Sequence, residues 1–104
     1  MKLRIRYNRD KQRKLKSVLV SQHVGVLVYF GIARCNPLDK FSKKNGRDMA
    51  STRSSEAYTR YSQHIGIDVL LSSDNIIFAD DMLHGCCHVD NIKSLITHFR
   101  YHIL

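Results

Sequence analysis

The sequence has few cysteines and no long apolar run. Of its three cysteines, two are adjacent at Cys86-Cys87. Three thiols do not form a disulfide framework, and an odd number is typical of reduced thiols in a reducing compartment. The longest apolar run, Val24 to Ala33, is about half of the ~20 residues that a membrane span needs, and it lies too far along the chain for a secretory signal. We therefore expect a cytoplasmic protein that does not associate with membranes.

Motifs of common catalytic sites are also missing. The sequence contains no glycine-rich phosphate loop and no paired-carboxylate motif. Cys86 or Cys87 with His84 or His88 would provide the residue types of an activated nucleophile, but their spacing matches no catalytic arrangement. The sequence therefore predicts a protein that is not an enzyme and that needs no cofactor.

Acidic residues are scarce, and their scarcity is uneven along the chain. Seventeen Lys and Arg against nine Asp and Glu give a formal net charge of +8. Residues 1–60 carry fifteen of the basic and four of the acidic side chains, whereas residues 61–104 carry two and five. The first half therefore presents an electropositive surface, which attracts the phosphates of nucleic acids or nucleotides.

Most of this charge lies in the first sixteen residues, which hold a single acid. The basic side chains there are Lys2, Arg4, Arg6, Arg9, Lys11, Arg13, Lys14 and Lys16. They predict a basic amino-terminal face that could bind nucleic acid, with Tyr7, Tyr58 and Tyr61 as candidates for stacking on bases.

Hydrophobic periodicity predicts one α+β domain with the element order βββαββα. Residues 2–7 alternate basic and apolar side chains, which indicates a half-buried strand with a cationic outer face. Residues 18–20 and 24–34 are β-branched and aromatic and predict two more strands, with a turn at 21–23 between them. Pro37 ends the second of these strands.

Later in the chain the pattern predicts a helix, two short strands and a second helix. The first helix begins at Ser42, which can cap free N–H groups, and runs toward His64. Residues 67–71 and 76–79 are the two strands, and Asp90 caps a helix with a regular apolar stripe. We expect a small antiparallel or mixed sheet with both helices packed on one face.

A second basic cluster surrounds the start of the first helix. Its members are Lys40, Lys43, Lys44 and Arg47, with Arg53 farther along. Cations there oppose the helix dipole, but together with free N–H groups they make an anion site. The alternative is a solvated basic face. Gly46, Ala50 and Ala57 share another side of this helix and predict a narrow seam against the sheet.

The stretch GIARCNPLDKFSKKNGRDMASTR, from Gly31 to Arg53, resembles a motif of small bacteriophage proteins. It is similar to the anti-Thoeris sponges, which sequester cyclic nucleotide signals of bacterial immunity. The resemblance implies a non-enzymatic counter-defence protein in the host cytoplasm, a homo-oligomer that holds a phosphorylated ligand between protomers. It also implies that Arg47 and Arg53 contact the phosphate. Phe41 and Asp39 would shape the loop.

Two binding functions therefore stay open. In the first, the protein binds a phosphorylated small ligand through Lys43, Arg47 and Arg53. In the second, the basic amino-terminal face binds nucleic acid or blocks a nucleic-acid enzyme of the host's defence, such as a CRISPR effector.

A zinc site is less favoured. His98 and His102 have the spacing of the histidine half of a zinc finger. Cys86 and Cys87, however, are adjacent, and adjacent side chains of an extended chain point to opposite sides. We therefore expect no metal.

Overall fold

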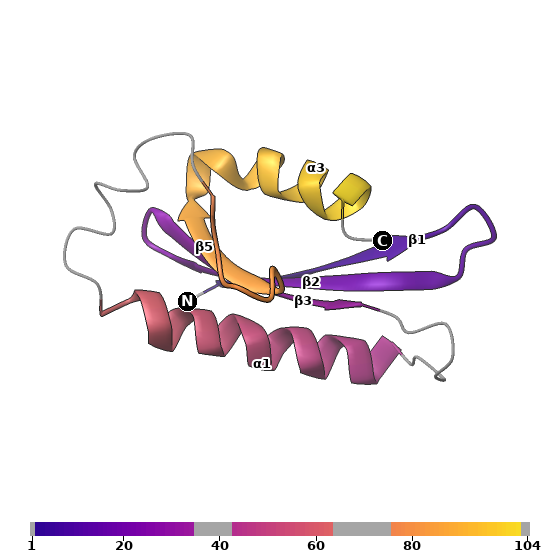
Figure 1. The fold of residues 1–104 in the computed structure, drawn as a ribbon, viewed down its shortest axis with the longest axis horizontal. Coiled ribbons are helices and arrows are strands. Elements are labelled where there is room, and N and C mark those ends of the chain that lie inside the picture. The colour runs from indigo at the N-terminus through magenta and orange to yellow at the C-terminus, as the bar shows by residue number, and fades with distance from the viewer. Residues whose placement is uncertain (1, 35–42, 64–75, 103–104) are drawn as a thin grey trace.

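The computed structural model describes residues 2–34, 43–63 and 76–102. Five strands form one antiparallel sheet in the spatial order β1-β2-β3-β5-β4 (Figure 1). The strands are β1 (Lys2–Arg9), β2 (Leu15–Val24), β3 (Leu27–Arg34), β4 (Ile77–Phe78) and β5 (His84–His88). The helices are α1 (Lys43–Tyr61) and α3 (Ile92–His102), the latter preceded by a 3-10 turn, Val89–Asn91. The α+β class and the order βββαββα are confirmed.

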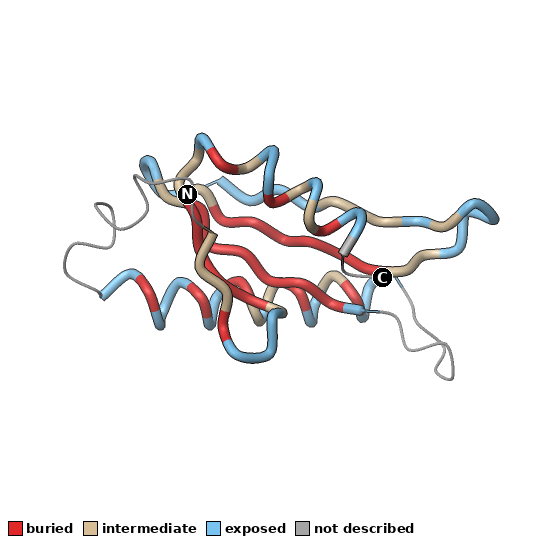
Figure 2. Tube along the Cα trace, turned by 45° about the horizontal axis from the view of Figure 1, so that its top comes forward, coloured by how far each residue is buried: buried red, intermediate tan, exposed pale blue. Residues whose placement is uncertain are grey.

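The two helices cover opposite faces of the sheet, so the prediction that both pack on one face is wrong (Figure 1). Ala57 of α1 packs with Tyr29 on one side, whereas Leu95 and Phe99 of α3 pack with Phe30 on the other. The reason lies in β3, whose successive side chains from Val28 to Ala33 are buried alike. A strand that is apolar on both faces needs a cover on both. Figure 2 shows the buried central strands lying between the helices.

Two strand predictions also change. The turn predicted at residues 21–23 lies inside β2, and the chain reverses instead between Val24 and Leu27, where Gly25 has a φ of +60°. β5 was not predicted, because its histidines and cysteines look like a chemical cluster rather than a strand. The strand predicted at residues 67–71 lies outside the described residues.

The narrow seam predicted on α1 is confirmed. The buried residues of α1 are Gly46, Ala50, Ser54, Ala57 and Tyr61. A Cβ atom added to Gly31 of β3 would lie 2.2 Å from the carbonyl oxygen of Ala50 and 2.3 Å from the amide nitrogen of Ser54. The backbones of α1 and β3 therefore touch at Gly31, which leaves no room for a side chain.

The substitution Gly31→Ala tests this close approach. It places a methyl group against backbone atoms of α1, so the helix must move away from the sheet. We expect the free energy of unfolding in urea to fall by about 1–3 kcal/mol, as in other overpacked cores. Gly25→Asn is the control, because a Cβ atom there meets nothing within 4 Å and Asn tolerates a positive φ. An equal effect of the two substitutions would contradict the close approach.

Candidate nucleic-acid interface

β1 is an edge strand whose two faces differ in character. Among the strands that the structure describes, it pairs only with β2, with Arg6 opposite Leu19 and Tyr7 opposite Val18. Leu19 belongs to the core under α3 and Val18 to the core under α1. Because side chains alternate along a strand, the even-numbered residues of β1 lie on the α3 side of the sheet. Lys2, Arg4 and Arg6 therefore form the cationic face that the sequence predicts.

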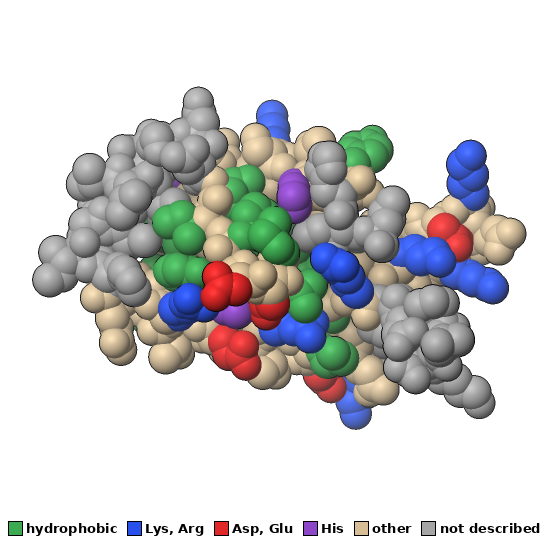
Figure 3. All heavy atoms as spheres, viewed as in Figure 1, with side chains coloured by type: hydrophobic (Ala, Val, Ile, Leu, Met, Phe, Trp, Pro, Cys, Tyr) green, Lys and Arg blue, Asp and Glu red, His purple; other side chains and the backbone are tan. Residues whose placement is uncertain are grey.

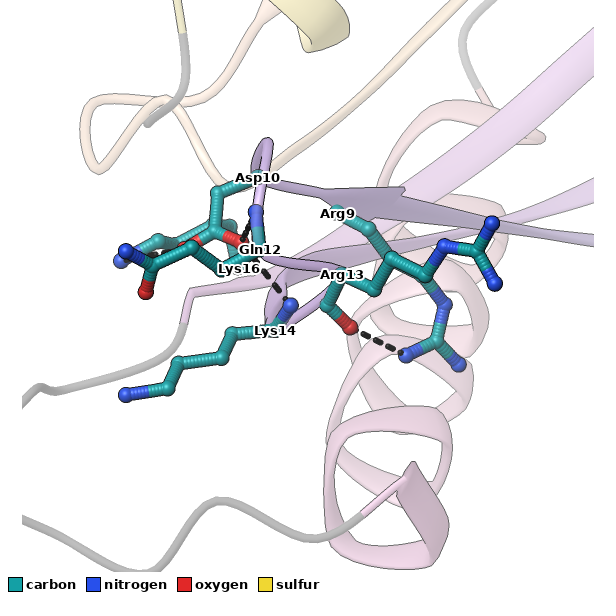
Figure 4. Close-up of polar contacts among 6 residues, drawn as sticks. All are labelled: Arg9, Asp10, Gln12, Arg13, Lys14 and Lys16. Atoms are coloured by element: carbon teal, nitrogen blue, oxygen red, sulfur yellow. Dashed lines mark hydrogen bonds and ion pairs between the residues drawn. The ribbon is translucent and has the colours of Figure 1, made fainter.

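The loop that joins β1 to β2 is organised by Asp10. The Asp10 carboxylate accepts hydrogen bonds from the amides of Gln12 (2.8 Å) and Lys14 (2.9 Å), and the Lys14 bond contributes most to lowering the pKa of Asp10. The Asp10 amide in turn donates to the Lys14 carbonyl at 2.9 Å. In Figure 4 the side chains of Arg9 and Arg13 point to one side of this hairpin, and that of Lys14 points to the other. The loop therefore presents its cations from a hydrogen-bonded turn.

Few of these cations have acidic partners. Lys16 lies 3.7 Å from the Asp10 carboxylate, and it is the only one of the eight with an ion pair among the described residues. Arg9 donates one hydrogen bond to the Arg13 carbonyl at 3.2 Å. Lys and Arg side chains gather over the hairpin, at the right-hand end of Figure 3. This end of the molecule therefore has a concentrated and largely unneutralised positive charge.

The pKa of His23 in β2 is affected by the positive charge of β1. It lies opposite Lys2 in the β1–β2 ladder, and its Nε2 lies 3.2 Å from the Ser21 hydroxyl. Burial lowers the pKa of His23 most, and repulsion from Arg4, Lys2 and Arg6 lowers it further. The positive potential of β1 therefore reaches the next strand.

The cluster predicted at the start of α1 is only partly described. Lys40, with Asp39 and Phe41, lies outside the described residues. The Lys43 ammonium lies 4.6 Å from the centre of the Tyr7 ring on β1, in a cation–π contact. Lys44 is exposed and Arg47 is half-buried. Lys43 thus joins the start of the helix to the edge strand.

Arg53 has a structural contact. Its Nη1 donates a 2.7 Å hydrogen bond to the carbonyl of Ile32 in β3. Arg53 also lines a surface hollow with Asp48 and Glu56, among other residues. Two carboxylates beside the guanidinium make this hollow a poor site for an anion. Among the described residues, Arg47 does not line the same hollow as Arg53.

The three tyrosines predicted to stack on bases are engaged elsewhere. Tyr61 is buried, and Tyr58 meets Tyr29 edge to face at 5.2 Å. Tyr7 packs against the core beneath Lys43. The most exposed ring among the described residues is instead that of Tyr101, in the last turn of α3, at 71%. Tyr101 was not predicted from the sequence as a residue that stacks on bases. Its position outside the apolar stripe of α3 is the signal that could have identified it, because a ring there has no place in the core.

The two cysteines of the zinc hypothesis lie on opposite faces of the sheet. Cys86 packs with Tyr29 on the α1 side of the sheet and Cys87 with Leu95 on the α3 side, so one metal ion cannot bind both thiols. Burial raises the pKa of Cys86 to about 11 and that of Cys87 to about 12. The His98 ring packs on Phe78, with ring centres 4.8 Å apart. The side chain of His102 lies outside the described residues.

Comparisons with protein families, with curated proteins and with solved structures gave no match. Among the described residues, no helix combines the length and the apolar character needed to cross a membrane. A function must therefore be inferred from the chemistry of the basic face on β1 and the β1–β2 hairpin.

We predict that His23 titrates below the ordinary histidine pKa of about 6.5. Burial and the three cations of β1 disfavour its protonation in the folded state. The unfolded chain then binds more protons, so stability should fall as the pH falls from about 6.5 through the lower pKa of the folded protein. NMR titration of the ring measures this pKa, and Arg4→Gln should raise it in part, because burial remains. A pKa at or above about 6.5 in the parent protein would contradict the prediction.

Proposed function

We propose that the protein binds nucleic acid through the basic face formed by β1 and the β1–β2 hairpin. The observation that carries the proposal is the local imbalance of charge: eight cations accompany one acid, Asp10, in residues 2–16. That acid is already occupied by two loop amides and by Lys16. Phosphates of a polyanion would supply the missing negative charge and release counterions.

The layout of the cations favours a linear polyanion over a single phosphate. Alternate residues of a strand are separated by roughly 6–7 Å, so Lys2, Arg4 and Arg6 form a row along the edge of the sheet. The hairpin loop adds Lys11, Arg13 and Lys14 beyond the end of β1, with Arg13 and Lys14 on opposite sides of the hairpin (Figure 4). Such a row suits a chain of phosphates.

Binding of this kind would let the protein cover nucleic acid or compete with a nucleic-acid enzyme. A host defence protein such as a CRISPR effector is a target of that chemistry, in keeping with the resemblance to phage proteins. The proposed mechanism is stoichiometric and electrostatic, and it requires neither a catalytic group nor a cofactor.

The matched pair of double variants Arg4→Gln/Lys14→Gln and Arg60→Gln/Lys93→Gln tests the location of the interface. Both pairs remove two exposed cations, but only the first lies on the basic face. For a short DNA oligonucleotide, the first variant should bind more weakly. Its slope of log K against log salt concentration should be shallower by about 0.9 for each phosphate that it no longer neutralises. Fluorescence anisotropy over a salt series measures both quantities. Equal weakening in the two variants would mean that net charge alone drives binding, against the proposal.

A second candidate function is the binding of a phosphorylated small ligand, such as a nucleotide signal, at the start of α1 between protomers. The observation in its favour is that the first turn of α1 holds no acid, and that Lys44 and Arg47 have no ion pair with any described residue. The contacts of Lys43 with Tyr7 and of Arg53 with Ile32 leave Arg47 as the stronger phosphate ligand.

The substitution Arg47→Glu tests this second candidate. A cation near the start of a helix opposes its dipole, so the change should leave the melting temperature unchanged or slightly raised. If Arg47 binds a phosphate, the new carboxylate should abolish binding of that ligand. Calorimetric titration with cyclic nucleotides and with short oligonucleotides measures the affinity. Unchanged affinity for every phosphorylated ligand that the parent protein binds would contradict the second candidate.

A further inference from the structure

A hollow lies where the base of the β1–β2 hairpin meets the last turn of α3. It has a volume of about 580 Å³, within the range of small-molecule sites. The described residues that line it are Asn8, Arg9, Asp10, Lys11, Lys16, Arg100 and Tyr101. The hollow therefore joins two segments far apart in the sequence, and one of them belongs to the basic face.

The charges around the hollow favour an anion. Four of its lining side chains are cations and one is acidic. The acid is Asp10, whose carboxylate already accepts two loop amides and lies 3.7 Å from the Lys16 ammonium. In Figure 4 the Arg9 guanidinium points away from the Lys16 ammonium, and one of its N–H groups donates to the Arg13 carbonyl. Lys16 and Arg100 are therefore the stronger donors for a phosphate bound in the hollow.

Tyr101 adds a planar apolar surface to the same hollow. Its side chain is the most exposed of the large apolar side chains in the described part of the chain, at 71%. The core does not require its ring, since Leu95 and Phe99 already fill the α3 side of the sheet. Proteins that bind single-stranded nucleic acids combine exposed aromatic rings with cations, because unpaired bases stack on the rings while the phosphates contact the charges.

Asn8 supplies a further polar group at the wall. Its Nδ2 atom is buried and has no hydrogen-bond acceptor among the described residues. A buried donor without an acceptor is unfavourable. Because this atom has almost no exposed surface, it lies behind the wall of the hollow, and a ligand reaches it only when the Asn8 side chain turns.

We infer that this hollow binds one nucleotide of a single-stranded nucleic acid, with the phosphate between Lys16 and Arg100 and the base on Tyr101. The inference rests on the proposed nucleic-acid function and adds a preference to it. A duplex keeps its bases stacked inside and offers none to Tyr101. The row of cations on β1 binds either form, whereas the hollow favours the single strand.

The test compares a single-stranded DNA oligonucleotide with a duplex of the same length at one salt concentration. Tyr101→Ala should weaken binding of the single strand by roughly 5- to 150-fold, the range expected when one base no longer stacks on a ring. Tyr101→Phe keeps the ring and should bind the single strand almost as tightly as the parent protein does. Met49→Ala, which removes another exposed apolar side chain, is the control.

The two proposals fail in different ways. If Tyr101→Ala binds the single strand as tightly as the parent protein, or loses affinity for the duplex to the same extent, the inference about the hollow is wrong. The proposed nucleic-acid function still stands in that case, provided that Arg4→Gln/Lys14→Gln weakens binding more than its control. If the parent protein binds neither form of DNA, both proposals are wrong. Circular dichroism checks that Tyr101→Ala retains the fold.

Discussion

The close approach of α1 to β3 at Gly31 is the constraint on which the rest of the fold depends. α1 has almost no large apolar side chain to bury, since its inner face consists mainly of Gly46, Ala50, Ser54 and Ala57. Its attachment must come from dispersion between closely packed backbones and from hydrogen bonds. Ser54 donates to the carbonyl of Tyr29. A side chain at position 31 would push α1 away from β3 and so weaken both the backbone packing and this hydrogen bond.

This attachment also explains why Arg53 is more than a surface cation. Its guanidinium donates to the carbonyl of Ile32, at a position where β3 no longer pairs with β5. An unpaired carbonyl near the core is costly, and a charged donor satisfies it well. The same hydrogen bond restricts the guanidinium and leaves fewer of its N–H groups for a ligand. The structure therefore gives Arg53 a clear role within the fold, independent of any phosphate.

Because both faces of the central strands are covered, positive charge is left to the margins of the sheet. β1 is the longer of the two edge strands of the sheet. Its cations also discourage pairing of its open edge with another strand. Protection of the edge explains Lys2, Arg4 and Arg6. It does not explain Lys11, Arg13 and Lys14, which lie in the loop beyond the strand and protect no edge. The excess in the loop is what favours a polyanionic partner over a purely structural use of the charge.

The sequence predicted those features that a local pattern can encode. The alternation of residues 2–7 and the apolar stripe of α3 correspond to β1 and α3, because burial of one face imposes a period on the side chains. The placement of the helices on opposite faces follows from a different signal. A strand without alternation needs cover on both sides, and β3 is such a strand. The turn at Gly25 was missed because the polar residues 21–23 look more like a loop than the apolar residues around Gly25.

The candidate site was predictable in its charge but not in its shape. Counting cations identifies the basic face, because charge is a property of the sequence. The hollow depends on the end of α3 lying beside the hairpin, and this proximity follows from the tertiary fold alone. Its two parts also act through different physics. In the proposed function, the row on β1 would attract phosphates through charge, which salt screens, whereas stacking on Tyr101 would depend on contact between two rings, which salt affects little. A surface that combined both would hold many nucleic acids weakly and still distinguish an unpaired strand from a duplex.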